Sequence, residues 1–210
     1  MRLERWNAER HAEGLFQAVG RSAEVWQFMP RGPFASAQEF SDMMDQMELS
    51  TAEPFVHYVV RRMAADQKIV GSLSFLRLRL AHGSVEIGQV AFSPADMQRT
   101  AASTEANYLM MRHVFDQLQP PFRRLEWKCW NLNLKSHNAA VRLGYVHEGV
   151  FRNDMVIQKN GVTRSRDTEW LSITDSEWPN VKRALELWLA PSNFDENGQQ
   201  RRTLQSFRAE

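Results

Sequence analysis

The chain has 210 residues, of which 43% are hydrophobic and 24% are charged, values typical of one globular domain with a full-sized core. Lys and Arg number 26 against 25 Asp and Glu, and this net charge of +1 argues against a nucleic acid or an anionic membrane as partner. No segment approaches the ~20 consecutive apolar residues that span a bilayer. The single cysteine, Cys129, excludes an internal disulfide, so we expect a cytoplasmic protein.

The first part of the chain is predicted to form one short strand and then helices. Residues 2–6 are typical of a strand, and Asn7 is a suitable N-cap for a helix that extends to residue 19. Ser36 is a suitable N-cap for a further helix over residues 37–49, whose apolar side chains recur on one face.

Three strands follow, over residues 54–63, 69–80 and 84–92. They are rich in β-branched and aromatic residues, and the short turns between them favour antiparallel neighbours. The strict alternation in the second strand predicts that its leucines share one face, namely Leu76, Leu78 and Leu80.

A long helix over residues 100–118 leads to a strand over residues 123–130. Because a helix of this length forms a right-handed crossover, we expect this strand to lie parallel to the one before the helix. Gly144 closes the next helix as a C′ glycine, and Asn160-Gly161 predicts the turn of a final hairpin.

The last predicted helix ends at residue 189 and is capped by Thr174 or Asp175. We expect one α/β (α+β) domain over residues 1–190, with a mixed, mostly antiparallel sheet of about seven strands and helices on both faces. Residues 191–210 are predicted to be a polar, extended tail, which could reach a partner in a homodimer. Its possible anchors are Phe194, Leu204 and Phe207.

The start of the long helix has no acidic residue between Gln98 and Thr104. The first N–H groups of a helix lack partners within it, so this end suits an anion such as a diphosphate. Thr100 can cap the helix alone, but a capping box fails because Ser103 stands where Glu or Gln is needed. An ordinary hydrated helix end explains the stretch equally well. The P-loop of NTPases is excluded, because its glycines and its Gly-Lys-Ser/Thr ending are absent.

Two segments resemble the GCN5-related N-acetyltransferase (GNAT) family. QRTAASTEA, at residues 98–106, is similar to the acetyl-coenzyme A loop of that family. NLKSHNAAVRLGYVHEGVFR, at residues 133–152, is similar to its pattern of Asn, then Ser, then a Gly-aromatic pair. The GY…EG continuation resembles the branch that contains the ribosomal-protein N-terminal acetyltransferases. The resemblance covers nearly the whole chain and implies a sheet that is splayed between its fourth and fifth strands.

The resemblance further implies acetyl-coenzyme A (acetyl-CoA) as the co-substrate and direct transfer without a metal. This chain departs from the family pattern at Ala101 and Ser103, where glycines are usual, and at Ala140, where a thiolate-protonating tyrosine is common. The implied cofactor-binding residues are Val90, Ala91, Phe92, Gln98, Arg99, Thr100, Ala101, Ala102, Ser103, Thr104, Asn133, Ser136, Asn138 and Arg142.

The resemblance also implies two catalytic residues. Glu86 would act through water as the base that deprotonates the amine, and its pKa would rise if apolar neighbours buried it. Ser136 would assist the leaving thiolate in place of the missing tyrosine. A plain surface role for Glu86 and an N-cap role for Ser136 stay open, as does a solvated helix position for Arg142. Glu148 and Asp154 are weaker candidates for the base, and a bulge near residues 88–92 would re-aim backbone donors.

The acceptor is less defined by the sequence. Trp26, Phe28 and Phe34 could wall a pocket for an amine, although they could equally be core anchors. The acceptor could be a peptide N-terminus or an amine-bearing small molecule. The alternative function is a non-catalytic acyl-CoA sensor with the same fold, which would bind the ligand without turnover.

Overall fold

The computed structural model describes residues 1–52, 54–98 and 100–209. Within these residues seven strands form one sheet in the order β1-β2-β3-β4-β5-β7-β6. All neighbours are antiparallel except β4 and β5, which are parallel as the long crossover helix predicts. The strands are β1 (Arg2–Arg5), β2 (Val56–Arg61), β3 (Ile69–Arg79), β4 (Ser84–Phe92), β5 (Arg124–Trp130), β6 (Val146–Lys159) and β7 (Val162–Thr174).

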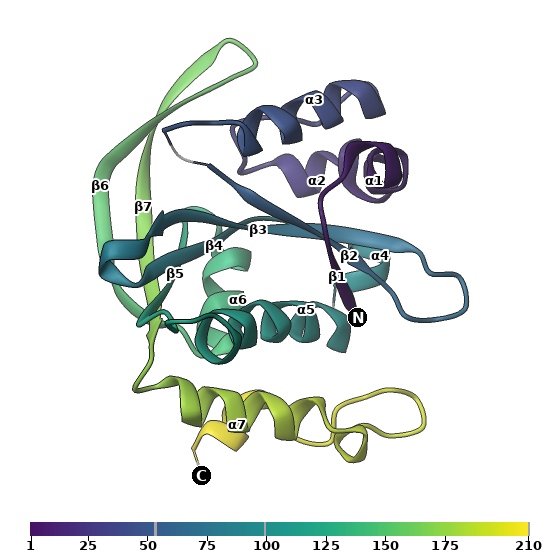
Figure 1. Ribbon diagram of the computed structural model, residues 1–210, viewed down its shortest axis with the longest axis vertical. Coiled ribbons are helices and arrows are strands. Elements are labelled where there is room, and N and C mark those ends of the chain that lie inside the picture. The colour runs from purple at the N-terminus through teal and green to yellow at the C-terminus, as the bar shows by residue number, and fades with distance from the viewer. Residues whose placement is uncertain (53, 99, 210) are drawn as a thin grey trace.

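Helices cover both faces of the sheet (Figure 1), so the predicted fold class is confirmed. On one face lie α1 (Ala8–Leu15), α2 (Ala23–Trp26) and α3 (Ala37–Glu48). On the other lie α5 (Ala101–Arg112), α6 (Leu134–Leu143) and α7 (Trp178–Leu189). Shorter helices are α4 (Pro94–Met97) and α8 (Leu204–Arg208), and π-helical turns extend α1 over Phe16–Gly20 and α5 over His113–Gln117.

The sheet separates two apolar cores. The larger core joins the sheet to α5, α6, α7 and α8, and it includes Leu125, Met111 and Leu185, all fully buried. The smaller core lies under α1, α2 and α3 and is centred on Phe40, which is also fully buried. Each face of the sheet thus has its own apolar core, because the helices on each face bury their apolar sides against the sheet.

Several local predictions are confirmed by geometry. Asn7 and Ser36 cap α1 and α3, because their side chains accept hydrogen bonds from the backbone N–H groups of Arg10 and Glu39. Gly144 ends α6 with φ of 115°, a conformation that favours glycine. Positive φ values at Asn160 and Gly161 form the tight turn of the β6–β7 hairpin.

The predicted cap of the last helix is wrong. The helix begins at Trp178, with Glu177 at the N-cap position and no side-chain cap. The hydroxyl of Thr174 instead donates a hydrogen bond to the carboxylate of Glu177 in the preceding turn. The carboxylate of Asp175 accepts a hydrogen bond from the backbone N–H of Ser176.

The predicted shared face of the leucines in β3 is also wrong. Leu76 is buried, but Leu78 is 38% exposed and Leu80 is 76% exposed. Arg77 has a φ of 50°, and the register with β4 shifts between Leu76 and Arg79. This irregularity breaks the alternation, so the end of β3 leaves the core.

The tail is folded, not extended. Leu204 and Phe207 on α8 are buried in the larger core, and Phe194 packs edge-on against Trp188 of α7. Arg208 donates a hydrogen bond of 3.0 Å to the carbonyl oxygen of Val141 on α6. All three predicted anchors are confirmed, and they attach the segment to the chain's own helices.

Candidate active site

The parallel strands β4 and β5 are paired only at their beginnings. Their register runs from Ser84 opposite Arg124 to Glu86 opposite Glu126. Beyond Glu86, within the described residues, the β5-facing edge of β4 has no strand partner. The strands therefore diverge, as predicted, and backbone groups along the far end of β4 are available on that edge.

A bulge lies in the unpaired part of β4. Ser72 and Ser74 of β3 lie opposite Ala91 and Gly88, so β4 contains one residue more than β3 over this interval. Gln89 takes up the change with a φ of 49°. The predicted bulge near residues 88–92 is confirmed, and it bends the strand next to Val90, Ala91 and Phe92.

The N-terminus of α5 lies beyond the end of β4. Thr100 is its N-cap, and its Oγ1 accepts a hydrogen bond of 3.3 Å from the N–H of Ala102. The first turn contains no acidic residue, as the sequence predicts. Small side chains at Ala101 and Ala102 leave the backbone approachable, and Ser103 bonds back to the carbonyl of Thr100. Arg99 lies outside the described residues.

Thr104 and Arg142 bond to each other. Thr104 is buried, and its Oγ1 accepts a hydrogen bond of 2.8 Å from Nη1 of Arg142. The guanidinium of Arg142 also lies 4.6 Å from the ring centroid of Trp188, and burial lowers its pKa. Arg142 is thus not a solvated helix charge, because it joins α6 to α5 and α7.

The start of α6 is organised by Asn133 rather than by Ser136. Asn133 Oδ1 accepts a hydrogen bond of 3.2 Å from the N–H of Ser136, so the N-cap role considered for Ser136 belongs to Asn133. Ser136 Oγ accepts a hydrogen bond of 3.0 Å from the indole Nε1 of Trp127 on β5. This contact fixes the hydroxyl oxygen against the diverging strand, while Asn138 is exposed to solvent.

Cys129 lies close to Ser136 and is buried. Burial raises the pKa of the Cys129 thiol, and the Ser136 hydroxyl offsets only part of that effect. A high thiol pKa suits a structural cysteine rather than a nucleophile.

Glu86 is buried among charged side chains. Its carboxylate lies 2.7 Å from Nη1 of Arg77 and 3.1 Å from Nζ of Lys128. Both side chains of the Glu86–Lys128 pair are only 4% exposed. Neither the surface position nor the apolar surroundings considered from the sequence are found. Arg77 and Lys128 form ion pairs with its carboxylate instead.

Two weaker candidates for the base are in different surroundings. Glu148 lies 2.5 Å from Nη2 of Arg124 and accepts a hydrogen bond from Ser172, and the bond with Arg124 lowers its pKa. Asp154 is exposed on β6.

Trp26 and Phe34 are core residues. Both are buried in the smaller core, where they contact each other edge-on, and Nε1 of Trp26 donates to the carbonyl of Val19. The predicted pocket wall is therefore wrong for these two. Phe28 is half-buried and packs edge-on against Trp130 at the end of β5, with 6.2 Å between the ring centroids.

The sequence interpretation missed the side chains that share this face with Glu86. Glu126, Lys128 and Trp130 alternate along β5, and Trp170 on β7 lies under the Lys128 ammonium at 3.6 Å from the ring centroid. The pattern EWKCW contained the signal, because a lysine in the middle of an otherwise buried strand requires partners.

Gln98 lies at the rim of the divergence. Its Nε2 donates a hydrogen bond of 3.1 Å to Glu24 on α2, and Lys135 on α6 lies 2.8 Å from the same carboxylate oxygen. Glu24 thus bridges the two segments on either side of the diverging strands.

Among the residues that the structure describes, no group of three His, Cys, Asp or Glu side chains could hold a metal ion. None of the described helices has the length and apolar character needed to cross a membrane.

Known proteins resemble this arrangement in both sequence and fold. The family described as acetyltransferase (GNAT) domain matches residues 1–146. A GCN5-related N-acetyltransferase from Brucella melitensis is 40% identical, with a TM-score of 0.87 over 99% of this chain and 90% of that chain. A probable GNAT-family acetyltransferase from Chromobacterium violaceum is 34% identical, with a TM-score of 0.74 over 84% of both chains.

A more distant structure shares the fold alone. The spermidine N-acetyltransferase from Vibrio cholerae, solved with CoA and spermine, is 17% identical, with a TM-score of 0.64 over 85% of this chain and 97% of that one. A search of curated sequences finds no match. The fold and the family match define an acyltransferase enzyme. The chain belongs to the GNAT acetyltransferase family.

Proposed function

We propose that this protein transfers an acetyl group from acetyl-CoA directly to a primary amine, on a peptide or protein N-terminus or on a small molecule. The observation that carries the proposal is the divergence of β4 and β5 between an acid-free helix N-terminus and the buried Glu86. The amine requires a nearby base, which Glu86 would supply on one side. The acyl carrier requires amides that suit an anion, which the start of α5 would supply on the other.

The residues at the divergence fit a CoA-type ligand. The first turn of α5 offers backbone N–H groups with no competing carboxylate, so the amides of residues 101–104 would hold the diphosphate. The free edge of β4 at Val90, Ala91 and Phe92 would bind the pantetheine amides. Gln98, Arg99, Thr100 and Ser103 would border the diphosphate. Asn133, Ser136, Asn138 and Arg142 would contribute from the α6 side.

Acetyl-CoA supplies a thioester, whose carbonyl carbon accepts the amine as the thiolate leaves. Glu86, placed between Arg77 and Lys128, would accept the proton of the amine through a water molecule. Ser136 would donate its hydroxyl proton in a hydrogen bond to the thiolate. The bond from Trp127 supports this role, because it holds the Ser136 hydroxyl oxygen against the diverging strand β5.

The acceptor classes differ in what they would need from this face of the sheet. If the protein acts like the ribosomal-protein branch, which the GY…EG segment suggests, its acceptor would be a peptide N-terminus. A small amine would need contacts only near the Phe28–Trp130 ring pair. The buried thiol of Cys129 supports a reducing compartment, and we place the protein in the cytoplasm.

Thiol release from acetyl-CoA against a panel of amines tests the proposal. We expect turnover with at least one amine, and a fall in kcat of about 100-fold for both Glu86→Gln and Ser136→Ala. The dissociation constant for CoA should change by less than about threefold, since neither substitution removes a diphosphate contact. Ser176→Ala, in an exposed turn, is the control. CoA binding without turnover on any amine would support the sensor and contradict the proposal.

A further inference from the structure

A buried guanidinium lies on the Glu86 face of the sheet without an assigned role. Arg166, Thr168 and Trp170 alternate along β7 and therefore share one face. Trp170 pairs with Lys128 across β5 and β7, and the Lys128 ammonium lies over its ring. Arg166 is thus on the same face as the pair formed by Lys128 and Glu86.

The polar atoms along this row lack protein partners. Nε of Arg166, Oγ1 of Thr168 and Nε1 of Trp170 are buried, and no described residue forms a hydrogen bond with them. Burial lowers the pKa of Arg166, and attraction to Glu86 and Asp154 does not offset that effect. A buried donor without a partner is costly, so three of them in a row indicate a place for an acceptor atom from outside the chain.

Arg166 lies near a group of ion-paired side chains. Among the described residues, ion pairs connect three cations to three carboxylates on this face. The group consists of Arg77, Lys128 and Arg124 with Glu86, Glu126 and Glu148. Arg166 is outside it. No described carboxylate forms an ion pair with Arg166, so its guanidinium is available to a carboxylate from outside the chain.

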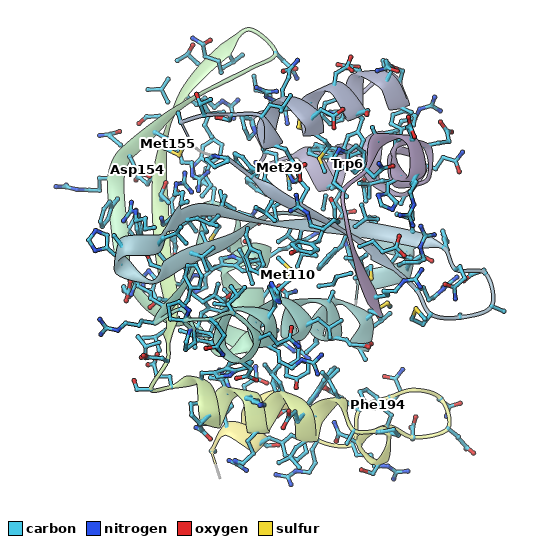
Figure 2. All side chains as sticks on the ribbon, viewed as in Figure 1. Trp6, Met29, Met110, Asp154, Met155 and Phe194 are labelled. Carbon is cyan, nitrogen blue, oxygen red and sulfur yellow. The ribbon has the colours of Figure 1, made fainter. Side chains whose placement is uncertain are left out.

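The side of the site toward α2 is closed by a lysine. Nζ of Lys159, at the end of β6, donates hydrogen bonds to the carbonyl oxygens of Trp26 and of Met29, the latter at 3.0 Å. Figure 2 shows Asp154 and Met155 from β6 on the same side of β3 and β4 as Met29. These hydrogen bonds attach the β6–β7 hairpin to the end of α2 and the segment after it. A longer acceptor that extended toward α2 would have to break them.

We propose that Arg166 binds a carboxylate on the acceptor, so that the preferred acceptor is a small amine of the amino-acid class. The proposal rests on the acetyl transfer proposed above. The guanidinium would hold the carboxylate in a charge-assisted hydrogen bond, with Thr168 and Trp170 as further donors, while the amine points toward Glu86. A polyamine has no carboxylate and would add positive charge beside Arg166.

The test compares acceptors that differ only at the carboxylate. Initial rates of thiol release are measured with each of the common amino acids, its carboxamide and its decarboxylated amine, and with spermidine and short peptides. We expect kcat/KM to be at least about 100-fold higher for the best amino acid than for its carboxamide. Arg166→Gln should remove most of that ratio by slowing only the carboxylate acceptor, and Arg166→Lys should restore part of it.

Controls separate this inference from the proposed function. Arg123→Gln, at a side chain that is 79% exposed, should leave the ratio unchanged. CoA affinity and the circular dichroism spectrum of Arg166→Gln show whether the variant is folded. Equal rates on amino acids and carboxamides, or a preference for spermidine or peptides, would overturn the inference while leaving acetyl transfer intact. No thiol release with any amine would overturn both.

Discussion

At the scale of single residues, Ser136 and His57 show how a neighbour defines a side chain's chemistry. Ser136 is fixed by the indole of Trp127, which donates to its hydroxyl oxygen, and the hydroxyl also lies beside the Cys129 thiol. His57 is fully buried on β2, with Nδ1 2.5 Å from Oγ of Ser74 and no partner for Nε2 among the described residues.

His57 predicts a dependence of stability on pH. Burial lowers its pKa from 6.5 to about 4, so the unfolded chain binds the proton more tightly than the native protein. Stability from this group is complete above pH 6.5 and is lost as the pH falls through about 4. The loss is about 3 kcal/mol. Urea unfolding between pH 7 and pH 4 measures it, and His57→Gln should unfold with a flatter dependence. Parallel curves for the two proteins would contradict the prediction.

Trp26 and Phe34 show the limit of single-residue interpretation. Apolar character alone does not distinguish the wall of a pocket from the interior of a core, and both residues pack inside the smaller core. Phe28, from the same segment, is half-buried and contacts Trp130. Only Trp26 lies on the short helix α2, whereas Phe28 and Phe34 lie in the irregular segment after it, which has no periodicity from which burial can be predicted.

At the scale of elements, the N-terminus of α5 was predictable because capping is local. The missing acid and the Thr100 cap involve residues adjacent in sequence, and both were predicted correctly. The row formed by Arg166, Thr168 and Trp170 was not predicted. Its position beside Lys128 depends on the pairing of β7 with β5, which lies more than 30 positions earlier in the chain.

A carboxylate placed in the first turn of α5 should have opposite effects on binding and on stability. Ala102→Glu should weaken CoA binding by about tenfold or more, because the charge competes with the diphosphate for the same amides. The helix itself should gain about 0.3–1 kcal/mol from its dipole. Isothermal titration and thermal melts measure the two quantities. Ala102→Gln controls for size, and equal CoA affinities of the two variants would exclude the anion site.

Glu24 links α2 to both sides of the divergence and adds negative charge at its rim. Lys135 and Gln98 lower the pKa of Glu24, so the carboxylate is ionised at neutral pH. Glu24→Gln should tighten CoA binding by about two- to fivefold at low salt, an effect that salt screens. Glu13→Gln, on the exposed side of α1, matches the change of charge. Unchanged affinity at low salt would indicate that Glu24 does not act on the ligand.

At the scale of the whole molecule, the C-terminal segment is part of the domain. The polar composition of residues 191–210 predicted an extended tail, because few apolar residues are available to hold it. Two buried side chains on α8 are nevertheless enough to fix it against α7. The antiparallel strands β2, β3 and β4 and the parallel β4–β5 pair followed from turn and crossover lengths, so this part of the fold was predictable although the contact of α8 was not.

Leu204 should therefore contribute to global stability. It is 1% exposed, and Leu204→Ala should lower the free energy of unfolding by about 2–5 kcal/mol. For a chain of this size the melting temperature should fall by about 5–15 °C. Gln205→Ala, on the exposed side of the same helix, is the control. A melting temperature within about 2 °C of the unmodified protein would show that α8 is not docked in solution.

The separation of the interior by the sheet has an evolutionary consequence. Substitutions under α1, α2 and α3 touch one set of packed side chains, and those around α5 and α6 touch another. Effects of changes that share no contacts are close to additive. Selection can therefore change side chains in one core, and with them the proposed amine-binding face, without changing the packing around α5 and α6, where we propose that CoA binds.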